Sequence, residues 1–378
     1  MKVIVVGAGS IGGCVALNLA ERGVSVVLVD AQDPGRGLSA HGFGWVNAVD
    51  NGTAAYFDLS AESLNAHGRL AARTEGEPWL FRRGNLHWAE SADDAERLRA
   101  VADGYRRLDY PVEEFDAERT LRELQPGLAL DALHGPVVYY PADAHVISDR
   151  FVAAVQARCR LAGVEIRTGD PVAGFVGADP VRGVVLASGE RIDADAVVTC
   201  AGRGTRELLG HVGADVPLVE PGDPRALTMG LLVRTSPSPV AVERILHAPH
   251  LSVRPHSDGR LVLHCHDVDH ELDPAHPDWA EQGRVAARRV LARLDEVLPG
   301  AGHGVEVESA FVGVRPMPQD GMSVLGWVPG AGSLYVVVTH SGLTLAPVLG
   351  EIVAGEVLGE GSALAAAFRP ERFAAGVV

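Results

Sequence analysis

The hydrophobic pattern is most regular at the start of the chain. Residues 3–6 form a run of β-branched side chains, which is typical of a strand buried on both faces. A glycine-rich turn follows, and the apolar segment 11–22 predicts a helix. After Gly23, the stretch SVVLVD (25–30) predicts a second strand. The chain therefore opens with a strand, a turn, a helix and another strand.

Amphipathic and alternating segments continue along the rest of the chain. The helices predicted from an apolar and a polar face lie at 53–75, 92–108, 149–162 and 281–298. The stretches with strand-like alternation around polar turns are 164–176, 183–202 and 225–267. Near the end, SLYVVVTHSG predicts a strand running into a turn, and an amphipathic helix begins just after Gly342.

These elements predict an α/β (α+β) protein in which a Rossmann-like nucleotide-binding domain is interleaved with a mainly antiparallel second domain. The segments are not separated by any long linker or low-complexity stretch. The residues expected in the nucleotide-binding domain are 1–80, 140–220 and 305–378. The residues expected in the second, substrate-binding domain are 81–139 and 221–304.

Composition narrows the class of protein. Hydrophobic residues make up 47% of the chain and charged residues 22%, which is ordinary for a folded globular protein. A net charge of −16 argues against a nucleic-acid partner. The sequence contains no apolar run of membrane-spanning length and no signal peptide. The four cysteines lie far apart without metal-ligand spacing, so we expect free thiols and a cytoplasmic location.

The turn after the first strand carries the pattern Gly7-x-Gly9-x-x-Gly12. The first two glycines allow a tight turn and close approach of the backbone to a pyrophosphate, and the third lets the helix pack against the strand. Asp30, 18 residues beyond Gly12, is suited to a ribose diol and disfavours a 2′-phosphate. The motif predicts dinucleotide binding, disfavours NADP, and leaves NAD and FAD open.

A second unit of strand, glycine and helix stands at the far end of the chain, around Gly342. A simple NAD-dependent dehydrogenase has no evident use for it. A helix N-terminus aimed at the electron-rich pyrimidine side of a flavin would stabilise charge that develops there. This unit favours FAD.

The sequence resembles the FAD-dependent amine oxidoreductases, a family that includes D-amino-acid oxidase, glycine oxidase, sarcosine oxidase and dimethylglycine dehydrogenase. The resemblance covers nearly the whole chain and rests on VIVVGAGSIGG with Asp30, SAHGFGWVN, DAVVTCAG, GVRPMPQDGMSVLG and THSGLTLAPVLG. It implies bound FAD and a D-amino-acid oxidase-like fold. The implied reaction is hydride transfer from an amine-bearing carbon to flavin N5, giving an imine that water hydrolyses.

The resemblance also implies a set of cofactor contacts. The pyrophosphate and the adenosine ribose are assigned to Gly7, Gly9, Gly12 and Asp30. The flavin ring is assigned to Ser39, His41 and Gly44 along its length and to the amides of Gly342, Leu343 and Thr344 at its pyrimidine end. The adenine is assigned to Val172, and the far side of the pyrophosphate to Ala201 and Gly202.

Two residues are implied for the substrate. Arg315 of the GxRP block is expected to hold a substrate carboxylate, a bidentate contact that suits a guanidinium group. The alternative is an arginine paired internally with an aspartate such as Asp320. His340 is expected to make a second polar contact, and its alternative is a hydrogen-bonded filler at a strand end.

Other histidines leave alternatives open. His41 matches the register of a histidine that binds FAD covalently in some relatives, while non-covalent lining of the flavin is the simpler interpretation. The cysteine that attaches flavin in monomeric sarcosine oxidase is replaced by Gly313. The segment HCHD with His270 has poor ligand spacing, so no metal site is predicted. The strand LSVRP lacks the substrate-orienting tyrosine of glycine oxidase and D-amino-acid oxidase, which leaves the substrate open.

The amine must be neutral when it reacts, because an ammonium has no lone pair to stabilise the iminium that forms. The leading hypothesis is an oxidase of a small amine or amino acid that passes electrons to O2 and releases H2O2. The alternatives are an FAD-dependent dehydrogenase that uses a quinone or carrier, an NAD-dependent dehydrogenase, and a non-catalytic flavoprotein subunit. A homo-oligomer is compatible with the sequence.

Overall fold

The computed structural model describes residues 1–49, 52–223 and 228–374. Its first sheet has six strands, and every neighbouring pair is parallel except β19–β20. In spatial order the strands are β19 (Val324–Trp327), β20 (Leu334–Val338), β13 (Ala196–Thr199), β1 (Lys2–Val6), β2 (Ser25–Asp30) and β9 (Glu165–Thr168).

This sheet is buried on both faces, which explains why β1 has no polar alternation. Val3 and Val5 pack in one hydrophobic cluster with helices α1 (Ser10–Glu21), α5 (Ser148–Leu161) and α10 (Gly342–Val357). Ile4 and Val6 face a different cluster. That cluster is built from α6 (Thr205–Gly210) and the antiparallel sheet of β10 (Val172–Phe175), β11 (Gly183–Leu186) and β12 (Arg191–Asp193).

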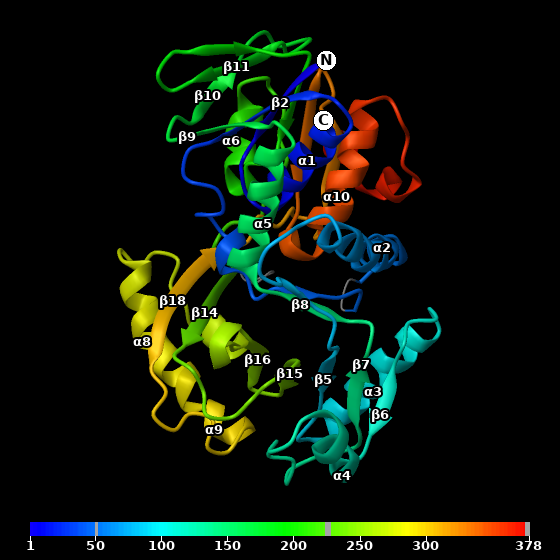
Figure 1. The fold of residues 1–378 in the computed structure, drawn as a ribbon, viewed down its shortest axis with the longest axis vertical. Helices are drawn as coiled ribbons and strands as arrows, with labels where there is room; N and C mark the ends of the chain where they lie inside the picture. Colours follow the sequence, from blue (N-terminus) through cyan, green and yellow to red (C-terminus); the bar gives the residue numbers. More distant parts are fainter. Residues whose placement is uncertain (50–51, 224–227, 375–378) are drawn as a thin grey trace.

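The second large sheet has eight strands and is antiparallel except for the β15–β5 pair. In spatial order the strands are β18 (Val307–Val314), β14 (Met229–Thr235), β17 (Leu261–His264), β16 (Leu251–Pro255), β15 (Ile245–Ala248), β5 (Asn85–His87), β7 (Val137–Tyr140) and β6 (Glu113–Phe115). Helices α8 (Trp279–Ala292) and α9 (Leu294–Val297) cover its outer face (Figure 1).

A small antiparallel sheet lies between the two large ones in Figure 1. Its strands are β3 (Trp45–Val46), β8 (Ala144–Val146) and β4 (Leu80–Phe81). The remaining helices are α2 (Ala54–Ala71), α3 (Ala92–Arg106), α4 (Ala117–Arg119), α7 (His266–Asp269) and α11 (Glu371–Ala374). The chain thus passes back and forth between the two large sheets.

The predicted α/β class with a mainly antiparallel second sheet is confirmed. The domain boundaries stay a prediction, and strand β18 from the segment 305–378 pairs with β14 in the eight-stranded sheet. The single helix expected over 281–298 was wrong. The chain leaves the helical path at Arg293, whose guanidinium binds Asp267 and the carbonyl of His250, and α9 follows as a separate short helix.

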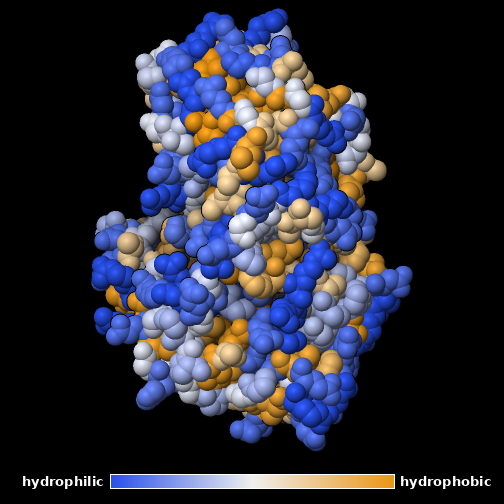
Figure 2. Space-filling view, in the orientation of Figure 1, coloured by the Kyte–Doolittle hydropathy of each residue, from blue (hydrophilic) through white to orange (hydrophobic). Residues whose placement is uncertain are grey.

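The surface is mostly hydrophilic on the face in Figure 2, with hydrophobic residues in small groups. The large hydrophobic side chains exposed in the described part of the chain come from separate places: Met1, Val101, Leu108, Leu161, Val285 and Leu358. The four cysteines are buried and free, as expected. Within the described ranges, no helix is both long enough and apolar enough to cross a membrane.

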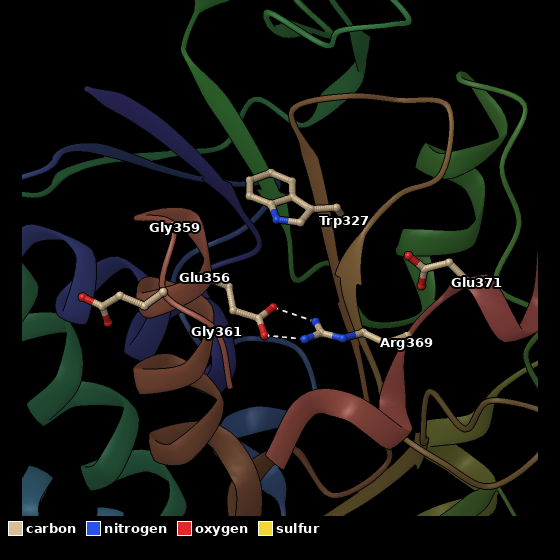
Figure 3. Close-up of a pocket in the computed structure, with 7 residues that line it drawn as sticks. Trp327, Glu356, Gly359, Gly361, Arg369 and Glu371 are labelled. Atoms are coloured by element: carbon tan, nitrogen blue, oxygen red, sulfur yellow. Dashed lines mark hydrogen bonds and ion pairs between the residues drawn. The ribbon is translucent and has the colours of Figure 1, made fainter. Parts of the chain in front are cut away.

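A buried ion pair closes the far end of α10. Glu356 lies on the last turn of the helix with 6% of its side chain exposed, and Arg369 donates to both of its carboxylate oxygens (Figure 3). The hydroxyl of Tyr335 on β20 donates to the same carboxylate at 2.6 Å. Glu356 and Arg369 border an open hollow beside Trp327. The pair therefore ties the C-terminal segment to the first sheet.

We expect Arg369→Ala to lower the free energy of unfolding by about 2 kcal/mol, because a buried carboxylate loses its cation while Tyr335 remains as a donor. Arg22→Ala is the matched control. Arg22 pairs with Glu360 at the surface, with 41% and 61% of the two side chains exposed, so its loss should cost less than about 0.5 kcal/mol. Thermal and urea unfolding measure both. Equal stability of the two variants would contradict the assignment.

Candidate active site

The glycine turn after β1 is too crowded for any other residue. A Cβ at Gly12 would lie 1.8 Å from the carbonyl oxygen of Gly7, and a Cβ at Gly7 would lie 2.5 Å from that of Cys200. Gly7 also has a φ of +102°. The Ala8 amide donates to the carboxylate of Asp30 at 2.6 Å, which fixes the turn against the end of β2. The motif has the form that dinucleotide binding requires.

Three distant segments meet beside this turn. The amide of Ser10, the first residue of α1, donates to Ser39 Oγ at 2.9 Å. Ser10 Oγ donates to the carbonyl oxygen of Gly342, the first residue of α10, at 3.3 Å. A Cβ at Gly9 would lie 2.8 Å from Ser39 Oγ, so this approach also depends on glycine. The two helix starts and the turn at Ser39 therefore form one cradle.

Both helix N-termini at the cradle suit an electron-rich group. The first turns of α1 and α10 consist of uncharged residues, so their positive ends are not neutralised locally. The first turn of α10 is held from behind by His67, whose Nε2 donates to the carbonyls of Leu343 and Thr344 at 3.1 Å. Burial lowers the pKa of His67 to about 4, so the ring is neutral at pH 7.

The residues assigned to the adenine and to the far side of the pyrophosphate follow strand ends at one edge of the first sheet. A Cβ at Gly7 would lie 3.1 Å from the Ala201 amide nitrogen, so Ala201 borders the glycine turn, and Gly202 follows it in the chain. The turn before Val172 is anchored by the Gly169 amide, which donates to the backbone carbonyl of Asp30 at 3.1 Å. All these residues follow the carboxyl ends of parallel strands, the position where open α/β sheets bind ligands.

The inner face of the eight-stranded sheet supplies the opposite wall. Strand alternation sends Leu231 and Val233 toward α8, so Gly230 and Leu232 face inward. Their partners on β18 are Gly313 and Phe311. The Arg315 amide extends this ladder by donating to Thr228 at 2.9 Å, which places Arg315 on the inner face as well.

Histidines continue this inner face across the sheet. His264 on β17 is paired with Ser252 on β16, and Ser252 is paired with His247 on β15. His247 Nδ1 and Ser252 Oγ are hydrogen-bonded at 2.9 Å. His87 on β5 lies opposite His247, with 4.3 Å between the ring centres. Burial lowers the pKa of His87 to about 3, so this ring is neutral at pH 7.

The loop that follows Ser39 bridges the cradle and the inner face. His41 is exposed at its outer edge and stacks on Phe311 of β18, with ring centres 4.1 Å apart. The ring centres of Phe43 and His264 are 6.0 Å apart, and those of Trp45 and His247 are 4.4 Å apart. Gly44 has a φ of +76° within this path. The loop thus places the aromatic side chains of Phe43 and Trp45 against histidines of the eight-stranded sheet.

A buried carboxyl group holds the end of this loop. Trp45 Nε1 donates to Asp143 Oδ2 at 2.8 Å, and Asn85 and Tyr110 donate to the same carboxyl group. Burial raises the pKa of Asp143 to about 7. The sequence alone did not indicate this network, since its four members lie far apart in the chain.

Arg315 lies on the inner face, at the end of the β14–β18 ladder. Burial lowers its pKa, and the negative charge of Asp269 acts in the opposite direction. Asp320, suggested from the sequence as a partner for Arg315, forms an ion pair with Arg372 at 2.6 Å. The carboxylate that acts on Arg315 is therefore Asp269, which sequence reasoning did not single out.

His340 is held in place by hydrogen bonds at both ring nitrogens. Its Nε2 lies 3.1 Å from the carbonyl oxygen of Gly321 and 3.3 Å from the Tyr56 hydroxyl, and its Nδ1 lies 3.0 Å from Ser341 Oγ. Burial lowers its pKa, and the charge of Arg315 adds to this effect. These contacts favour the hydrogen-bonded filler over a direct substrate contact, although His340 remains within electrostatic reach of Arg315.

Comparison with known proteins agrees with this geometry. The family described as FAD dependent oxidoreductase matches residues 2–356. A glycine oxidase of Pseudomonas aeruginosa is 28% identical over 357 residues, covering 92% of each chain. The structure of glycine oxidase from Geobacillus kaustophilus superposes with a TM-score of 0.83 at 23% identity, covering 96% of each chain. L-proline dehydrogenase from P. horikoshii superposes with a TM-score of 0.82 at 17% identity, covering 99% of this chain and 98% of the other.

We expect Gly12→Ala to abolish flavin binding, because the new methyl group would collide with the Gly7 carbonyl and push α1 off β1. Gly37→Ala is the matched control, since a Cβ there meets no heavy atom within 4 Å. The flavin content of each purified variant is read from the ratio of absorbance near 450 nm to that at 280 nm. A Gly12→Ala protein with one flavin per chain would contradict the role of this turn.

Proposed function

Since the chain belongs to the FAD-dependent oxidoreductase family, we propose that it oxidises a small α-amino acid, with Arg315 holding the substrate carboxylate. The predicted family and the predicted cofactor are confirmed, and the NAD-dependent alternative is set aside. FAD-dependent amine oxidation is the general activity. The amino-acid substrate, the residue roles and the use of O2 belong to this proposal.

The proposal rests most heavily on Arg315. A guanidinium group in this partly buried position retains its charge even where burial lowers its pKa. It lies on the inner face of the eight-stranded sheet, opposite the cradle that the cofactor residues form. A carboxylate is the planar anion that such a group binds through two parallel hydrogen bonds.

We assign the cofactor's ADP half to the glycine turn, where Gly7, Gly9 and Gly12 leave room for phosphate and Asp30 faces the ribose. The ring system is assigned to the space between the start of α10 and the loop from Ser39 to Gly44. Bound there, FAD supplies a two-electron acceptor for the hydride leaving the substrate carbon. The amides of Gly342, Leu343 and Thr344 would hold the pyrimidine side of the ring.

The chain's own residues position the donor and exclude water. Arg315 fixes one end of the substrate, so that its amine-bearing carbon points away from the sheet toward the cradle. The aromatic rings of Phe43 and Trp45 pack against His264 and His247. In this proposal they give the substrate an apolar surface next to these polar histidines. Desolvation of this kind favours the neutral amine, which is the reactive form.

We further propose that FAD is held non-covalently and reoxidised by O2. His41 is exposed and its ring stacks on Phe311, an arrangement that needs no bond to the cofactor. Acid precipitation of the protein should leave the yellow flavin in the supernatant. During aerobic turnover of glycine, sarcosine or D-alanine, peroxidase-coupled dye should report H2O2. Electron transfer only to an added quinone would favour the dehydrogenase alternative.

Arg315→Ala should lower kcat/KM for a carboxylate-bearing substrate by about 1,000-fold, because it removes both charge and bidentate geometry. Arg315→Lys keeps the charge and should recover only part of the activity. Arg206→Ala, which removes a surface arginine paired with Asp215, is the matched control. Anaerobic flavin bleaching measured at several substrate concentrations separates binding from reduction. Unchanged kcat/KM in Arg315→Ala would remove the carboxylate assignment.

A further inference from the structure

Asp269 is a buried carboxylate whose two oxygens are both engaged. It is 1% exposed and ends the short helix α7. Its Oδ1 accepts a hydrogen bond from the Leu231 amide at 2.7 Å. Strand β17 pairs with β14 only at Val233 and Arg234, so it does not pair with Leu231. Its Oδ2 lies 2.7 Å from His264 Nε2. A Cβ at Gly230 would lie 3.3 Å from Oδ2, so the absence of a side chain at position 230 makes room for this oxygen.

The contact with Asp269 determines which nitrogen of His264 carries the proton. An ionised carboxylate can only accept, so Nε2 is the protonated nitrogen and Nδ1 keeps its lone pair. Only 14% of the His264 side chain is exposed, on the inner face of the sheet beside Phe43. This pairing of carboxylate and imidazole is the one that orients a histidine as a proton acceptor.

We infer that His264, oriented by Asp269, accepts the proton of the substrate's ammonium group before hydride transfer. The inference rests on the proposed function and names the group that prepares the substrate. The N–H bond of the ammonium breaks, its electron pair stays on nitrogen as the lone pair, and the proton forms an N–H bond at His264. The C–H hydride then leaves with its pair for the FAD named above, and His264 later returns its proton to water.

The charges around Arg315 fit a zwitterion. The partly buried guanidinium of Arg315 lies within electrostatic reach of Asp269, and His264 is hydrogen-bonded to that same carboxylate. An α-amino acid arrives with a carboxylate and an ammonium on adjacent carbons. Its carboxylate matches Arg315, and its ammonium matches the side of Asp269 and His264.

The other groups facing His264 do not compete for the proton. The titratable and charged groups around it are Asp269, His266, His247 and Arg315. Burial lowers the pKa of His266 to about 4 and that of His247 well below its ordinary value. His266 lies 4.6 Å from His264, ring centre to ring centre, and reaches the surface. It offers the proton a path to water.

The same atoms admit a rival interpretation. Ligand atoms of His264, His266 and Asp269 lie within 4.8 Å of one another, a spacing that one divalent ion could span. In this structure, however, the Leu231 amide and the His264 ring take the two Asp269 oxygens. We therefore interpret the cluster as a hydrogen-bonded pair, and metal content is one outcome of the test.

The test compares the pH dependence of anaerobic flavin reduction in the holoenzyme, using whichever of glycine, sarcosine and D-alanine reduces it fastest. His264→Gln should reduce the flavin about 100-fold more slowly at pH 7 and recover as pH rises, because the amine then loses its proton to water. The pH at which the reduction rate begins to rise should be higher in His264→Gln than in the wild type by at least about one pH unit. His303→Gln, an exposed histidine, is the matched control. A His264→Gln profile that overlies the wild type overturns the inference.

Asp269→Asn tests the positioning role without depending on turnover. An amide nitrogen would donate to His264 Nε2 and move the ring proton to Nδ1. The ¹⁵N shifts of the His264 ring should therefore show the Nε2–H tautomer in the wild type and the Nδ1–H tautomer in Asp269→Asn. An unchanged tautomer overturns the role of Asp269. One tightly bound zinc per chain, removable by EDTA, also overturns the inference.

Acetate separates this inference from the proposed function, because it carries a carboxylate and no amine. Its binding to the oxidised holoenzyme is followed by the change in flavin absorbance. His264→Gln should bind acetate as the wild type does, while Arg315→Ala should lose at least about tenfold in affinity. If Arg315→Ala binds acetate normally and none of the three amino acids reduces the flavin, the proposed function fails. If only the His264→Gln result fails, the inference alone is wrong.

Discussion

The close approach of backbone at the glycine turn is the constraint on which the rest of this structure depends. The Gly7 carbonyl lies where any side chain at position 12 would begin, so α1 packs directly on the turn. The same helix packs on α10, where a Cβ at Gly350 would lie 2.8 Å from Cys14. Small residues at both contacts let the two helices begin side by side. The hydrogen bond from Ser10 to Gly342 follows from that geometry.

That constraint links the cofactor residues to the substrate wall. Because α10 starts beside α1, its first turn also faces the loop after Ser39, and Thr344 Oγ1 donates to the Trp45 carbonyl at 2.8 Å. The same loop carries Phe43 and Trp45 onto the histidines of the eight-stranded sheet. One short stretch of chain thus contacts both the start of α10 and the histidines of the eight-stranded sheet. Substitutions in this stretch would alter both the cofactor site and the substrate site.

Local patterns predicted the parts of the fold that depend on neighbouring residues. The run 3–6, the glycine turn and Asp30 lie within one strand–helix–strand unit, so their spacing alone indicated a dinucleotide site. The strand–glycine–helix pattern around Gly342 likewise indicated the start of α10, and the resemblance added Arg315. Asp269 could not be singled out from the sequence, because three acidic residues, Asp267, Asp269 and Glu271, follow His264 closely. Only the turn of α7 shows that Asp267 points outward to Arg293 while Asp269 points inward to His264.

The inner wall also shows why histidine suits this pocket better than lysine or glutamate. A permanent charge at position 87 or 247 would be buried without a counter-ion and would cost several kcal/mol. Imidazole remains neutral there because burial lowers the pKa of both rings. It still offers a hydrogen-bonding nitrogen on a strand that must pack against Trp45. Burial thus keeps His87 and His247 neutral, while Arg315 and Asp269 supply the two charges that an amino-acid zwitterion would complement.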